Sequence, residues 1–89
     1  MKIKTKDGLE IEVNKEAFND METLDALVDL NDEDVFAISR ICKKVFSKEE
    51  KKKLYDFYRD KKDGQVKLEV FLPVFSEIME QLGEEEKNS

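Results

Sequence analysis

The sequence predicts a mainly α-helical (α+β) fold, in which an N-terminal β-hairpin packs on a bundle of about four helices. Three observations support this fold class. The dipeptide Asp7-Gly8 is a favoured two-residue hairpin turn, and alternating apolar and charged residues follow it. Ser47 followed by Glu50 is a typical helix start, and the segment 68–82 repeats its apolar residues at helical spacing.

The length of the chain sets its domain organisation. Its 89 residues suffice for one small domain, and 39% of them are hydrophobic, which is enough for a packed interior. We expect one compact domain over residues 1–83, with the hairpin in 1–14 and the helices in 20–82. The residues 84–89 have no apolar anchor, so we expect a disordered acidic tail there.

The hairpin and the first helix each have a predicted buried face. Leu9, Ile11 and Val13 alternate with glutamates, so their side of the hairpin, which also carries Ile3, should lie on the helices. Asp20 can cap the free N–H groups of the helix that follows it. We expect the core residues of that helix to be Leu24, Leu27 and Val28.

The second helix is predicted to begin after Asn31 or Asp32, since either side chain can cap it. Acidic residues then fall in its first turn, and Lys43 and Lys44 lie near its other end, as the helix dipole favours. Its predicted buried stripe consists of Val35, Ile38, Ile41, Cys42, Val45 and, as an open case, Phe46.

The third helix has the clearest predicted start, because Ser47 and Glu50 form a capping box. It should end before Gly64, which can adopt the left-handed conformation that stops a helix. We expect its core residues to be Leu54, Phe57 and Tyr58.

The last two helices and their loop resemble an EF-hand in shape. With Gly64 at the sixth loop position, the first position is Arg59, the third Lys61, the fifth Asp63 and the twelfth Val70. Two cations and an apolar side chain therefore replace three of the carboxylates that hold calcium. The sequence predicts a helix-loop-helix without calcium ligands.

The fourth helix, from about Leu68 to Leu82, is the predicted central core helix. Pro73 falls on its solvent face within the first two turns, where we expect a mild kink. Val70 and Val74 widen its apolar arc, and Phe36 lies off the buried stripe of the second helix. Either these three side chains pack on the hairpin and on one another, or they form an exposed patch that binds protein.

The sequence contains little equipment for catalysis. Cys42 is the one cysteine and there is no histidine, so neither a disulfide nor a histidine-activated thiol can form within the chain. We expect Cys42 to be a small buried hydrophobe. Paired carboxylates occur at a helix start and in the tail, where capping and solvation explain them. The sequence predicts no enzyme, no metal and no cofactor.

Charge is unevenly distributed along the chain. The segment from Glu16 to Asp34 carries eight acidic residues, whereas the segment from Arg40 to Lys62 carries ten basic and four acidic residues. Two neighbouring helices of one molecule can neutralise each other in this way. Alternatively, the acidic face of one copy can meet the basic face of the next in head-to-tail self-association.

The basic segment has two interpretations. Lysines next to Tyr55 and Tyr58 could contact phosphates and bases, but they fit equally well on the solvated side of an amphipathic helix. The formal net charge of -6 favours the second interpretation, so we expect no nucleic-acid partner. The candidate protein-binding residues are Phe36, Val70, Val74, Lys51, Lys52 and Tyr55.

The order of these features resembles the tail assembly chaperones of long-tailed bacteriophages, from about Leu9 to Leu82. The resemblance rests on LEIEV, then DMETLDALVDL, the polar break NDED, the charged helix KKLYDFYRD and the closing helix DGQVKLEVFLPVFSEIMEQL. It implies a helical, acidic, non-catalytic chaperone of virion assembly. Such a protein binds the aggregation-prone tape measure protein while tail tube protein assembles around it.

We therefore expect a phage tail assembly chaperone whose partners are the tape measure and tail tube proteins. The alternative is a small acidic adaptor or inhibitor that docks on a host or phage enzyme. The chain has no run of about 18 apolar residues, so we expect no membrane partner and a site of action in the cytoplasm, the host's if a phage encodes it. A codon choice of GAA-AAA-AAC at Glu86 to Asn88 would create a slippery heptamer for ribosomal frameshifting.

Overall fold

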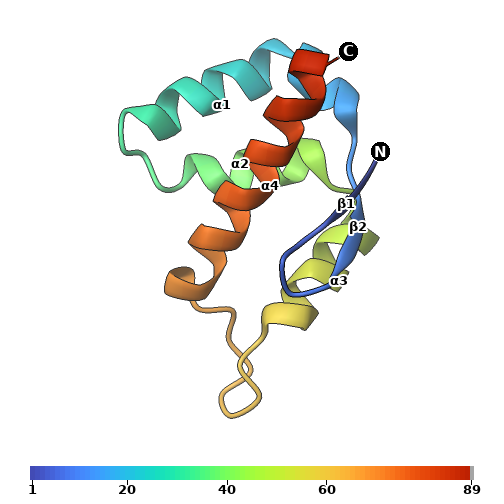
Figure 1. Cartoon of the computed structure of the whole chain (residues 1–89). Coiled ribbons are helices and arrows are strands. Elements are labelled where there is room, and N and C mark those ends of the chain that lie inside the picture. The colour runs from blue at the N-terminus through green and yellow to red at the C-terminus, as the bar shows by residue number, and fades with distance from the viewer. Residues whose placement is uncertain (89) are drawn as a thin grey trace.

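The computed structural model describes residues 1–88, with side chains as far as Gly83 (Figure 1). Within these residues a two-stranded hairpin precedes four α-helices, which confirms the predicted fold class. In Figure 1, α4 crosses in front of α2, and α1 lies along the top of the view. The elements are β1 (Lys2–Lys4), β2 (Glu10–Glu12), the 3-10 helix η1 (Lys15–Asn19), α1 (Met21–Asn31), α2 (Ala37–Val45), α3 (Lys48–Tyr58) and α4 (Leu68–Asn88).

The hairpin forms, but its loop contains three residues, Lys6 to Gly8, rather than the two that were predicted: the Thr5 N–H donates to the Leu9 carbonyl at 2.9 Å and the Gly8 N–H donates to the Thr5 carbonyl at 2.9 Å. Ile3 pairs with Ile11 across the two antiparallel strands, and both side chains are buried. Gly8 takes a φ of 93°, which the turn requires and which other residues rarely adopt. The hairpin is fastened to two helices. The Glu12 N–H donates to the Glu50 carboxylate of α3 at 3.0 Å, and the Lys6 N–H donates to the Glu77 carboxylate of α4 at 2.8 Å.

The core lies around α2, whose buried face meets α1, α3 and α4. As predicted, Ile38, Ile41, Cys42, Val45 and Phe46 are all buried on this face. Leu54 of α3 and Ile78 of α4 are fully buried as well. The core therefore draws on every helix and on the hairpin, so no element folds around its own apolar face alone.

The buried face of α1 differs from the prediction. Leu24 and Val28 were expected in the core, but they are exposed, and Thr23 and Ala26 are buried instead. Asp20 does cap the helix, since its carboxylate accepts the Glu22 N–H at 2.7 Å. The small side chains of the Thr23 face let α1 approach α2 closely, which the larger Leu24 face would prevent.

The start of α2 also differs from the prediction, because Asn31 and Asp32 still belong to the end of α1. The Asp32 N–H donates to the Val28 carbonyl at 3.0 Å, and Glu33 takes a left-handed φ of 71°. The Asp34 carboxylate then accepts the Phe36 N–H at 3.1 Å, and α2 begins at Ala37. Val35 consequently lies before the helix and is exposed rather than part of the buried stripe.

One half of the predicted capping box of α3 is present. The Ser47 hydroxyl accepts the Glu50 N–H at 3.2 Å, whereas the Glu50 carboxylate accepts from the hairpin as described above. Phe57 was expected in the core but is half exposed, and it packs edge-on against Tyr58 with ring centroids 4.9 Å apart. The hydrogen bonds of the Tyr58 hydroxyl to Thr5 and Asp7 draw that ring to the hairpin and leave Phe57 outside.

The fourth helix begins at Leu68 as predicted but does not end at Leu82. It continues to Asn88, so the expectation of a disordered tail from residue 84 is wrong as far as Asn88. Gly83 stays within the helix and does not take a left-handed φ, and the glutamates and lysine after it are good helix formers. Ser89, the last residue of the predicted tail, lies outside the described residues. Pro73 is exposed, as expected.

Candidate protein-binding groove

The charged segments neutralise each other within one molecule at the α1–α2 interface. Arg40 of α2 pairs with Asp29 at 2.9 Å, and Lys44 of α2 pairs with Asp20 at 3.3 Å and Glu22 at 3.2 Å. The hydrogen bonds that the Lys44 ammonium donates to the Glu22 and Asp20 carboxylates raise the pKa of Lys44 above its usual value. These side chains are partly exposed, so the pairs orient the two helices more than they stabilise the fold.

An apolar groove opens between the first turns of α2 and α4. It has a volume of about 440 Å³. Four segments contribute to it: the turn before α2, α2 itself, α3, and the residues at the start of α4. The side chains that line this apolar groove are Val35, Phe36, Ile38, Ser39, Tyr55, Val66, Leu68 and Phe71.

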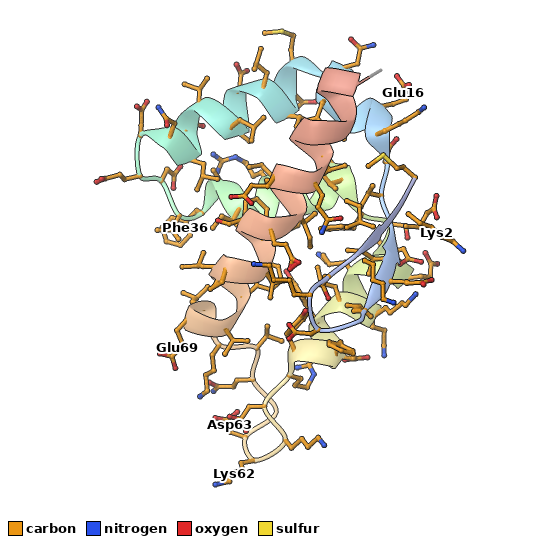
Figure 2. The ribbon with its side chains drawn as sticks, viewed as in Figure 1. Lys2, Glu16, Phe36, Lys62, Asp63 and Glu69 are labelled. Atoms are coloured by element: carbon orange, nitrogen blue, oxygen red, sulfur yellow. The ribbon has the colours of Figure 1, made fainter. Side chains whose placement is uncertain are left out.

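Phe36 is the most exposed large apolar side chain among the described residues, with 83% of its surface accessible. Figure 2 shows it at the N-terminal end of α2, at the edge of the molecule. The local backbone explains this position. Glu33 reverses the chain and Asp34 holds the Phe36 N–H, which places Phe36 immediately before the helix rather than on its buried face. Leu68 is exposed on the facing wall of the groove.

The floor of the apolar groove is rigidly built. The Tyr55 and Phe71 rings meet edge to face with centroids 5.5 Å apart, and Phe75 stacks on Phe71 at 6.4 Å. Burial raises the pKa of Tyr55, whose ring belongs to this floor. Aromatic pairs of this geometry contribute about 0.5 to 1.5 kcal/mol beyond their buried area, which stabilises the arrangement of this floor.

The groove continues along α4 toward the C-terminal end. Ile38 also lines a second hollow of about 440 Å³, which we call the groove extension, together with Leu27, Leu30, Leu72, Phe75, Ser76, Met79 and Glu80. A third hollow of about 260 Å³ shares Leu27 and Met79 with it and reaches Leu82. Side chains of α4 from Leu68 to Leu82 therefore border three hollows, of which the first two share Ile38 and the last two share Leu27 and Met79.

One end of the apolar groove is basic. The Lys51 ammonium lies 5.9 Å from the centroid of the Tyr55 ring, one helical turn before it on α3. Within the described part of the chain Lys51 forms no ion pair; Lys43 also forms none, but it lies in the hollow between α1 and α2, with Asp25 and Asp29, and not at the groove. Lys52, in contrast, pairs with Asp56 at 2.8 Å, and this contact lowers the pKa of Asp56.

Of the six predicted binding residues, three lie at the apolar groove and three lie elsewhere. Phe36 and Tyr55 line the apolar groove, and Lys51 stands at its basic end. Val74 is 7% exposed and belongs to the core, so its inclusion was wrong: α4 packs on neighbours over a wider arc than one stripe. Val70 is exposed but lies outside the groove, and Lys52 is exposed and paired within its own helix.

Six residues that line the groove were not among the predicted binding residues: Val35, Ile38, Ser39, Val66, Leu68 and Phe71. Val35 was assigned to the buried stripe of the second helix and Leu68 to the start of the predicted core helix, because their helical phase matches the core, and Val66 was not a candidate. Their signal was present in the sequence as apolar residues just outside a helix start. Without the positions of the helix ends, that signal cannot be separated from core periodicity.

The titratable side chains form no reactive cluster in the part of the chain described. Burial raises the pKa of the Cys42 thiol to about 11, so it stays protonated at neutral pH, as expected of a small buried hydrophobe. No group of three Cys, Asp or Glu side chains within residues 1–88 is placed to hold a metal ion. No helix among the described residues is long and apolar enough to cross a membrane.

Comparison of the chain with family models, curated proteins and solved structures finds no match. The site must therefore be interpreted from its own geometry: an apolar groove, an exposed phenylalanine at its edge and a basic end.

Proposed function

We propose that this domain is a non-catalytic assembly chaperone that binds an amphipathic helix of another protein in the apolar groove. The observation that carries the proposal is the exposure of Phe36 beside Leu68 at a groove with an aromatic floor. Large exposed apolar side chains that cluster in this way are typical of protein-binding surfaces. The resemblance to tail assembly chaperones supports a phage tape measure protein as the client.

The dimensions of the surface fit a helix. From Leu68 to Leu82 the groove and its extension border α4 over about 20 Å, the length of roughly four helical turns at 1.5 Å per residue. An amphipathic helix of that length presents apolar residues at i, i+3, i+4 and i+7, which suits a groove of this kind. A long helical client offers many such segments, so several copies could hold one client.

The basic end favours a client helix with acidic residues at one end of its apolar face. Lys51 forms no ion pair in the described part of the chain, so its ammonium is available to a partner. Exposed charges of this kind set the orientation of a bound helix and the rate of association more than they set its affinity.

Coexpression tests the proposal directly. The probe is the longest helical protein encoded next to this chain, and the measurement is its soluble fraction after lysis. Wild type should keep this protein soluble, and Phe36→Ser should lower the soluble fraction at least about fivefold, because an exposed anchor at a groove contributes about 1 to 2 kcal/mol to binding.

Val70→Ser is the control, since Val70 is an exposed apolar residue of α4, two residues after Leu68, but lies outside the groove. This variant should keep the client soluble. If both variants behave like wild type while circular dichroism shows both folded, the groove is not the client site. If wild type leaves the neighbouring protein insoluble but inhibits an enzyme, the adaptor or inhibitor alternative replaces the chaperone.

A further inference from the structure

The outer face of α1 carries an apolar stripe that the proposed client site does not use. Met21, Leu24 and Val28 are spaced i, i+3 and i+7, so they share one side of the helix. Their exposed fractions are 67%, 49% and 53%. The buried residues Thr23 and Ala26 lie on the opposite side, against α2. We call these three exposed residues the α1 stripe.

The α1 stripe has an acidic border. The helix from Met21 to Asn31 contains no basic residue. Its carboxylates fall into two groups: Glu22 and Asp29 pair with α2, as does the N-cap Asp20, whereas Asp25 forms no ion pair in the part of the chain described. At 100° per residue Asp25 lies beside Met21, next to the stripe. The stripe therefore presents apolar side chains with the unpaired Asp25 carboxylate along one edge, where Asp25 also borders the hollow that Arg40, Lys43 and Lys44 line.

We infer that the α1 stripe of one copy docks in the apolar groove of a second copy. The two surfaces complement each other in apolar character and in charge. The stripe is a short amphipathic helix face with an acidic border, and the groove takes an apolar helix face and has a basic end at Lys51. Both surfaces are exposed on the same chain, so each copy carries the two halves of the contact.

The contact is head to tail. The stripe and the groove are different surfaces of the molecule, so docking one in the other leaves a free groove on the first copy and a free stripe on the second. Such heterologous contacts propagate into short chains or close into rings. A symmetric contact between two α1 stripes is disfavoured, because it brings the Asp25 side chains and their acidic neighbours together.

Self-association of this kind covers the apolar groove when no client is present. It uses the groove of the proposed function, so a client and the α1 stripe compete for the same surface. The inference does not depend on the identity of the client, and it can fail or hold separately, since the stripe itself takes no part in client binding.

Sedimentation equilibrium of three proteins tests the inference. The average mass of wild type should rise with concentration up to about 1 mM, and high salt should reduce it. The double variant Leu24→Ser/Val28→Ser loses the stripe and keeps the groove. Phe36→Ser keeps the stripe and weakens the groove. Each variant alone should have a self-association constant at least about tenfold lower than wild type, because each loses apolar contact area.

A mixture of the two variants decides the geometry. The intact stripe of Phe36→Ser can enter the intact groove of the double variant, so the mixture should form 1:1 dimers that grow no further. A symmetric α1 contact predicts instead that Phe36→Ser associates alone and that the mixture gains nothing. Wild type that stays monomeric at every concentration overturns the inference, as does a double variant that still associates.

Charge exchange provides a second readout. Lys51→Glu should weaken self-association, and a partner copy with Asp25→Lys should restore it. If the copies associate through other surfaces, Asp25→Lys should not restore association. The stripe variant should still keep the neighbouring helical protein soluble. A stripe variant that loses self-association but still binds the client supports the docking of the α1 stripe. Loss of client binding by Phe36→Ser, in contrast, tests only the proposed function.

Discussion

Matched truncation of two leucines tests which face of α1 is buried. Leu24 of α1 and Leu54 of α3 each lie in an 11-residue helix, and each can be changed to alanine, the best helix former. Leu54 is fully buried, whereas Leu24 is 49% exposed. Identical chemistry is therefore removed at both positions, and the difference in burial decides the difference in cost.

The magnitudes follow from burial. Fully burying a leucine contributes about 1.5 to 3 kcal/mol, so removing a half-exposed one should cost about 1 kcal/mol or less in free energy of unfolding. Leu54→Ala also leaves a cavity in the core and should cost about 2 to 5 kcal/mol. A domain of this size has a total stability of roughly 5 to 10 kcal/mol, so both losses lie within a measurable range.

Urea unfolding followed by circular dichroism at 222 nm is the assay, with the slope of free energy against urea required to stay constant between variants. The reasoning is refuted if Leu24→Ala costs as much as Leu54→Ala. That outcome would place Leu24 in the core, as its periodicity alone suggested, and would remove the exposed α1 stripe together with the head-to-tail contact built on it.

Three further predictions give the direction in which stability should change. Thr23→Val should raise the free energy of unfolding by about 1 kcal/mol in a urea titration, because the buried Thr23 hydroxyl has no hydrogen-bond partner in the part of the chain described. Stability should fall as pH rises from 9 to 11, since the unfolded Cys42 thiol ionises near 9.0 and the folded one near 11; this shift corresponds to about 3 kcal/mol. Cys42→Ala should flatten that alkaline loss relative to wild type, and an equal slope in both proteins would contradict the assignment. Gly64→Ala should cost about 1 kcal/mol at a φ of 74°, with no clash to add to it, and a thermal melt unchanged from wild type would contradict this.

Local signals predicted much of the fold. Asp7-Gly8 correctly marks the hairpin turn, although Gly8 closes a three-residue loop rather than the predicted two-residue one, and the Ser47 hydroxyl needs only the N–H three residues later. These features depend on a few neighbouring residues, so a sequence pattern contains them fully. The start of α4 at Leu68 was predicted for the same reason.

The errors concern choices between faces, which tertiary packing decides. On α1 both the Leu24 side and the Thr23 side repeat at helical spacing, and hydrophobicity alone favours the leucine side. Close approach to α2, fixed by the ion pairs of Arg40 and Lys44, requires the smaller side chains instead. Val74 was misplaced for the opposite reason, since α4 has neighbours on several sides and buries more than one stripe.

The binding groove could be predicted only in part. Phe36 and Tyr55 stood out as candidates because one lies off a buried stripe and the other sits in a basic helix. Phe36 and Tyr55 line one hollow because of the backbone at Glu33. Its left-handed conformation turns the chain, so α2 begins only at Ala37 and Phe36 stays outside the helix. No periodicity in the sequence encodes that single backbone conformation.

The turn at Glu33 also explains why the acidic and basic segments do not neutralise each other fully within one molecule. The late start of α2 sets Arg40 and Lys44 opposite α1, where they neutralise Asp29, Asp20 and Glu22. Of the residues that remain, Lys51 of α3 stands beside the groove and Asp25 of α1 lies beside the α1 stripe, whereas Glu16, Asp32 and Glu33 lie outside α1. Internal pairing therefore does not exhaust the two charged segments. It neutralises the charges that face inward and leaves opposite charges beside the two exposed apolar surfaces. This arrangement favours a directional, head-to-tail contact between copies.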